Sequence, residues 1–109
     1  MLESETIGDF LRRMRDESNI PLRKMAALLD IDPSTLSKME RGLRFPSQET
    51  IVHIASQFSI EEQEMHAHYL SERIALELIE VENTDRIVNL IGEKIKIFQS
   101  RAPIVHGKR

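Results

Sequence analysis

Residues 31–42, IDPSTLSKMERG, carry side chains whose types and spacing suit a partner with hydrogen-bonding groups and negative charge. Asp32 is a helix-start signal and Gly42 is a helix-stop signal. A helix that buries Leu36 and Met39 presents four polar side chains on its other side: Ser34, Ser37, Lys38 and Arg41. Small hydroxyls and lysine can reach the edges of nucleic-acid bases, and arginine at a helix end suits a phosphate. An ordinary solvated helix face has the same composition. These four side chains, the polar stripe, are therefore compatible both with a solvated face and with a nucleic-acid contact.

Two short helices joined by a tight turn would position this stripe. Apolar residues recur at i, i+3, i+4 and i+7 from Leu22 to Leu29, which predicts a helix over 21–29 with Pro21 in its first turn. Three residues later, Asp32 caps the next helix. Two helices with so short a connection form a helix-turn-helix unit.

Similar apolar spacing predicts further helices over 7–16 and 48–58. Thr6 and Ser47 are their expected caps, because short hydroxyl side chains accept hydrogen bonds from free N–H groups in a first helical turn. The helix-turn-helix unit is therefore expected to be flanked by helices on both sides.

A capping box of Ser59 and Glu62 predicts a fifth helix. The chain of 109 residues has only four Gly, four Pro and five aromatic residues, and few runs in which apolar and polar residues alternate. We therefore predict an all-α fold with five helices in residues 1–69.

Residues 70–98 have apolar side chains on two sides of the predicted helices, so they must be covered on two sides. The fifth helix either continues through this segment or a new one starts at Ser71, and a last helix is predicted over 85–98. We expect the segment to dimerise through eight apolar residues: Leu70, Ile74, Leu78, Val81, Ile87, Ile91, Ile95 and Phe98. An extra core layer within a monomer is the alternative. Residues 99–109 are expected to form a flexible basic tail.

Charge is unevenly distributed along the chain. Residues 1–46 carry eight basic and eight acidic side chains, residues 47–82 carry one and eight, and residues 83–109 carry six and two. The acidic middle segment can mask a local basic cluster in the total of −3. The net charge therefore does not exclude a nucleic-acid partner.

The chain has no cysteine, which excludes disulfides and thiol chemistry and fits a reducing compartment, so we expect a cytoplasmic protein. No apolar run approaches the roughly 20 residues of a membrane span, and we expect no membrane partner.

The histidines give little support for a metal site or for catalysis. His66 and His68 are two positions apart, so on a helix they diverge and cannot easily share a metal, although Glu64 and Glu72 have better spacing to His68. His53 and His106 have no obvious partners. We expect no catalytic residue, no metal, no cofactor and no small-molecule ligand.

Three segments together resemble the Cro/repressor (XRE) helix-turn-helix family, which includes phage repressors and restriction–modification controller proteins. They are IGDFLRRMR, LRKMAALLDIDPSTLSKMERG and FPSQETIVHIASQFSI, and they cover roughly residues 6–70. The string MAALLDIDPSTLSKMERG is the specific part. The resemblance implies a five-helix domain that places its third helix in the major groove of DNA, usually as a dimer.

Carried over by position, the resemblance implies base contacts by Pro33, Ser34, Ser37 and Lys38, and phosphate contacts by Arg41 and Arg44. Leu22 stands where the family often has a polar residue that touches phosphate, and Arg23 or Lys24 can substitute for it. A structural ion pair between Arg15 and Glu40 is also implied. The complete expected DNA-binding set is Arg23, Lys24, Pro33, Ser34, Thr35, Ser37, Lys38, Arg41 and Arg44.

The expected function is that of a DNA-binding transcriptional regulator, a repressor or autoregulator, which acts as a homodimer on a palindromic operator in double-stranded DNA. The alternative is an antitoxin-type protein whose C-terminal helices bind a toxin or another protein.

Overall fold

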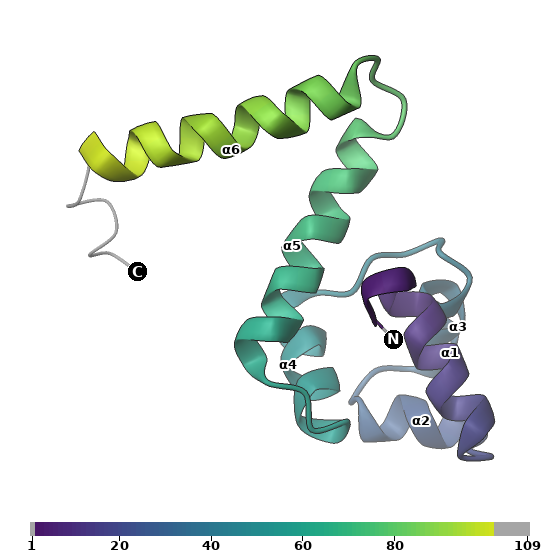
Figure 1. Ribbon diagram of the computed structural model, residues 1–109. Coiled ribbons are helices and arrows are strands. Elements are labelled where there is room, and N and C mark those ends of the chain that lie inside the picture. The colour runs from purple at the N-terminus through teal and green to yellow at the C-terminus, as the bar shows by residue number, and fades with distance from the viewer. Residues whose placement is uncertain (1, 102–109) are drawn as a thin grey trace. The chain divides into compact units, whose positions relative to one another are not determined.

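The computed structural model describes residues 2–101, and its regular elements are all helices, which confirms the all-α prediction. The elements are η1 (Leu2–Ser4), α1 (Ile7–Glu17), α2 (Leu22–Leu28), α3 (Pro33–Glu40), α4 (Gln48–Gln57), α5 (Glu62–Leu78) and α6 (Thr84–Arg101). The chain divides into two compact units between Ala75 and Leu76. Figure 1 shows α1 to α4 gathered beside the first turns of α5 in the first unit.

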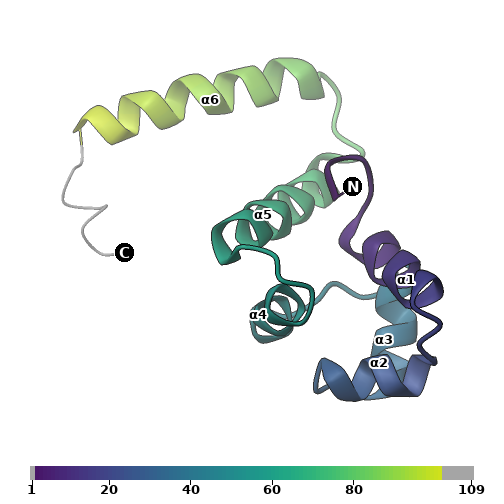
Figure 2. The ribbon, with the colours of Figure 1, turned by 60° about the horizontal axis from the view of Figure 1, so that its bottom comes forward.

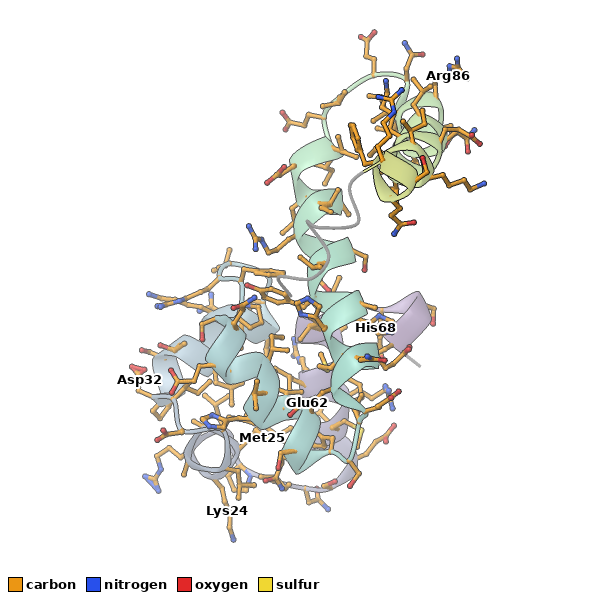
Figure 3. The ribbon with its side chains drawn as sticks, turned by 90° about the vertical axis from the view of Figure 1, so that its left-hand side faces the viewer. Lys24, Met25, Asp32, Glu62, His68 and Arg86 are labelled. Atoms are coloured by element: carbon orange, nitrogen blue, oxygen red, sulfur yellow. The ribbon has the colours of Figure 1, made fainter. Side chains whose placement is uncertain are left out.

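The first unit has one hydrophobic core, to which η1 and the first five α-helices all contribute. Its largest fully buried side chains are Ile7, Leu11, Met25, Leu29, Leu36, Ile54 and Met65. Burying each of them contributes about 1.5–3 kcal/mol relative to leaving it in water. Figure 3 shows the resulting separation of neighbours on α2, where Met25 lies among the helices and Lys24 points away from them.

The helix starts follow the sequence closely. Thr6 accepts a hydrogen bond from the Asp9 N–H, and the Asp9 side chain accepts one from Thr6 in return. Ser47 caps α4 by accepting a hydrogen bond from the N–H of Thr50. Both predicted caps are confirmed, because each helix begins where its first free N–H groups find an acceptor.

The first four α-helices all end in the same way. The second residue beyond each helix has a positive φ: Asn19 (55°), Asp30 (60°), Gly42 (76°) and Ser59 (55°). In each case the next residue donates a backbone hydrogen bond to a carbonyl five positions back, as Leu43 does to Lys38 at 2.8 Å. These turns stop the helices sharply and keep the connections short.

Two sequence predictions about helix limits are wrong, the cap at Ser59 and the end of the last helix at Phe98. Ser59 does not cap α5, because its left-handed backbone ends α4 instead, and α5 begins at Glu62. Of the two alternatives left open at Ser71, the continuation of the fifth helix is confirmed, since α5 runs on to Leu78. Residues 99–101 belong to α6, which ends at Arg101 rather than Phe98. The remainder of the predicted flexible tail lies outside the described residues.

Gly8 on α1 lies directly against the backbone of α3. A Cβ atom placed on Gly8 would overlap the backbone carbonyl oxygen of Met39 on α3. Figure 2 shows α1 and α3 lying side by side at this contact. A glycine therefore allows the backbones of α1 and α3 to touch, which sets how deeply α3 lies in the domain.

Gly8→Ala should destabilise the protein by about 3 kcal/mol, because the added methyl group must displace backbone rather than a flexible side chain. Gly42→Ala is the matched control: its Cβ would meet nothing within 4 Å, so only the left-handed backbone costs energy, about 1 kcal/mol. Chemical unfolding of both variants measures the difference, and equal losses would contradict the close packing of α1 on α3.

Glu72 of α5 caps the start of α1 from a distance in sequence. One carboxylate oxygen accepts a hydrogen bond from the Ile7 N–H at 2.9 Å. Burial raises the pKa of Glu72 above its usual 4.5, while the hydrogen bond from Ile7 lowers it and the nearby Asp9 charge raises it further. The contact joins the first and last helices of this unit.

Because the pKa of Glu72 is raised in the folded state, its contribution to stability is fully present below the unfolded pKa and is lost as pH rises through the folded pKa. Glu72→Gln keeps an oxygen that can accept from Ile7 and removes the charge. Thermal unfolding should therefore show the variant gaining stability relative to the parent as pH rises from about 4 to 7. A constant difference across this range would contradict the assignment.

The second unit contains the last turn of α5 and α6. No residue of α6 is buried within the described chain. Among the helices that the structure describes, none combines the length and apolar character needed to cross a membrane. Ile87 and Leu90 are half-buried, whereas five apolar side chains of α6 are exposed: Val88, Ile91, Ile95, Ile97 and Phe98.

Candidate nucleic-acid interface

The connection between α2 and α3 has four residues, Leu29 to Asp32, in which apolar and acidic side chains alternate. Asp30 takes the left-handed conformation that ends α2, and Ile31 packs on the core. Asp32 is the N-cap residue of α3 and accepts a hydrogen bond from the Thr35 hydroxyl at 2.8 Å. That hydrogen bond lowers the pKa of Asp32. The carboxylate thus holds the first turn of α3 in place.

The outward edge of α3 lies opposite its buried side. Leu36 and Met39 are buried, whereas Ser34, Lys38 and Arg41 are exposed. Ser37 is half-buried and lies between them in sequence. Three of these four residues are therefore exposed on the outward edge of α3.

The other expected contact residues flank this edge. Arg23 and Lys24 are exposed on α2, and Arg44 is exposed in the connection that follows α3. Pro33 and Thr35 are half-buried, and the Thr35 hydroxyl is already bonded to Asp32. The Ser34 hydroxyl also donates to the Asp32 carboxylate, at 3.5 Å, so the longer of these two hydrogen bonds must be exchanged before Ser34 can donate to a base.

A buried ion pair fixes the orientation of α3. The Arg15 guanidinium of α1 donates to both carboxylate oxygens of Glu40 on α3, at 2.9 and 3.0 Å. It also donates to the Ile20 carbonyl oxygen at 3.4 Å. The Glu40 side chain is only 5% exposed and that of Arg15 is 19% exposed. The two parallel hydrogen bonds set both the distance and the angle between α1 and α3.

Glu40→Leu should destabilise the protein by about 2–3 kcal/mol, because it leaves the Arg15 charge without its partner in a mostly buried position. The double variant Arg15→Met/Glu40→Leu should recover most of that loss, since it also removes the unpaired charge. Urea unfolding of the single and double variants tests this. A double variant that is less stable than Glu40→Leu would show that the loss in Glu40→Leu does not come from the unpaired Arg15 charge.

His53 belongs to the support of the interface, a role that sequence reasoning missed. Its Nδ1 lies 3.0 Å from the carbonyl oxygen of Leu29, at the end of α2. The nitrogen must carry the proton to donate to that carbonyl. The contact joins α4 to the connection between α2 and α3. No sequence spacing signals it, because the two residues are distant in the chain.

The other histidines of the described chain do not form a metal site. His68 pairs with Glu64 at 3.0 Å, and His66 stacks on Tyr69. In residues 2–101, no group of three or more potential metal-ligating side chains comes together. The chemistry that the described site offers is hydrogen bonding and charge.

The sequence pattern of the helix-turn-helix family matches residues 11–65, just over half of the chain. These residues run from α1 into α5 and include the turn, α3 and the Arg15–Glu40 pair. The chain belongs to this family, in its Cro/XRE branch of DNA-binding transcription regulators. A search of curated proteins and a search of solved structures found no match.

Proposed function

We propose that the protein is a homodimeric transcriptional repressor or autoregulator that binds a palindromic operator. The observation that carries the proposal is the exposed edge of α3, which is held outward by the buried Arg15–Glu40 pair. Residues 1–69 bind DNA and residues 70–98 dimerise. The protein acts by occupying promoter DNA, and it has a binding function rather than a catalytic one.

Within this proposal, the polar and charged side chains on and near α3 divide between base contacts and phosphate contacts. Ser34, Ser37 and Lys38 read base edges, because they lie on the exposed side of α3 facing away from the core. Arg41 follows the last turn of α3 and Arg44 lies in the next connection, so both bind phosphates. Arg23 and Lys24 on α2 bind the phosphates on the other side of the groove.

The exposed apolar side chains support dimerisation. Within residues 2–101, ten of the thirteen large apolar residues that are exposed lie between residues 70 and 98: Leu70, Ile74, Leu76, Ile79, Val81, Val88, Ile91, Ile95, Ile97 and Phe98. Such a concentration is typical of an interaction surface. One short helix discriminates poorly between DNA sequences, since each good bidentate contact with a base contributes only about 1–3 kcal/mol. Two joined copies double the readout and fix half-sites about 34 Å apart.

Lys38→Ala should weaken binding to an operator selected from random DNA and relax the preference at one base position. Arg41→Ala should lower affinity for all sequences and reduce the dependence of log K on log salt by about one unit, because one phosphate contact is lost. Binding-site selection and salt titrations measure both effects.

Arg12→Ala is the control, since Arg12 is an exposed cation of α1 that belongs neither to the expected DNA-binding set nor to the dimerisation segment. Its affinity and salt dependence should match those of the parent. Equal weakening of all sequences by Lys38→Ala would make Lys38 a phosphate contact and contradict its role in base reading. An unchanged salt dependence in Arg41→Ala would contradict its role.

A protein-binding role resembling that of an antitoxin would use the same C-terminal surface. Analytical ultracentrifugation of the purified full chain separates the two. A stable dimer without any partner supports the proposal, whereas a monomer favours the protein-binding role.

A further inference from the structure

The surface of α6 is organised for pairing with another helix. Val88, Ile91, Ile95 and Phe98 follow one another at intervals of three, four and three residues. All four are between 39% and 62% exposed. This spacing is that of a coiled-coil seam, and branched residues at three of its positions pack well between two helices. The seam is unoccupied by any other part of its own unit.

The second unit also has opposite charges at its two ends. Residues 77–86 carry four acidic side chains, Glu77, Glu80, Glu82 and Asp85, and one basic side chain, Arg86, for a net charge of −3. Residues 93–101 carry one acidic side chain, Glu93, and three basic ones, Lys94, Lys96 and Arg101, for a net charge of +2. Three of the four acidic residues, Glu77, Glu80 and Glu82, precede α6, whereas the three basic residues of 93–101 lie along the second half of α6, beside the last part of the seam.

This charge separation distinguishes the two ways in which two copies of α6 can pair. A parallel pair would place acidic end beside acidic end and basic end beside basic end, which is unfavourable at both. An antiparallel pair places the acidic end of each copy beside the basic end of the other. Charge thus favours one orientation, although the apolar seam would be covered in either.

We infer that α6 pairs with α6 of a second copy of this chain in an antiparallel arrangement, with the Val88–Phe98 seam buried between them. The inference rests on the proposed homodimer and adds its contact and its orientation. Opposite ends attract in this arrangement, so dimerisation should weaken as salt is raised. A parallel pair, with like ends adjacent, should strengthen instead.

The orientation can be measured directly because the chain has no cysteine of its own. Arg86→Cys and Ser100→Cys place labelling sites near the two ends of α6, both on the side away from the seam. One full-length copy carries a donor dye and the other an acceptor with a short Förster distance. Two pairings are compared: Ser100→Cys with Ser100→Cys, and Arg86→Cys with Ser100→Cys.

In an antiparallel dimer the two Ser100 labels lie roughly 20 Å or more apart along the helix axis, and the mixed pair lies at nearly the same height. Energy transfer should therefore be stronger in the mixed pair. A parallel dimer reverses the order, with the mixed pair separated by about 20 Å along the axis. The reversed order, or equal transfer in both pairings, would overturn the inference, as would a monomer.

Sedimentation of the labelled chains and an operator-binding assay accompany the energy-transfer measurement. A dimer that binds the operator but shows the reversed order would overturn the α6 orientation and leave the proposed function standing. A dimer with the expected order that binds no DNA site in preference to others would overturn the proposed function and leave the α6 orientation standing. A sedimentation dimer that tightens between 0.1 M and 1 M salt would also contradict the charge pairing.

Discussion

The orientation of α3 depends on its contact with α1, and the rest of the interface depends on that orientation. Gly8 lets the two backbones touch, and Arg15 then reaches Glu40 with two parallel hydrogen bonds. A helix of eight residues cannot hold a fixed direction by itself, because so short a helix is unstable alone. The buried pair and the close backbone contact therefore determine which side of α3 faces the solvent.

The sequence predicted most of this first unit because its signals are local. Thr6 and Ser47 cap helices over short distances, and Gly42 ends α3 with the left-handed backbone expected of a glycine. The prediction that Ser59 caps α5 failed because a residue type that caps helix starts can also adopt a left-handed conformation at a helix end. Only the backbone distinguishes the two, and the preceding Phe58 gives no signal.

The site was less predictable than the fold. The outward position of Ser34, Lys38 and Arg41 follows from helical spacing, and the Arg15–Glu40 pair followed from family resemblance rather than from spacing. His53 and Glu72 could not have been found, because each bonds a backbone group of a helix that is 24 or 65 residues away in sequence. The polar contacts that join the helices of this unit are thus long-range in sequence. The side chains of α3 that would face DNA, by contrast, follow from the helical spacing of α3 alone.

The most direct test is nuclear magnetic resonance mapping of the full chain against a DNA duplex selected from random sequence. Backbone amide signals of residues 34–44 and of the start of α2 should move most, and signals of the buried α1–α3 contact should keep their positions. If the largest changes fall on α4 and α5 while the outward edge of α3 is unaffected, α3 is not the helix that meets DNA.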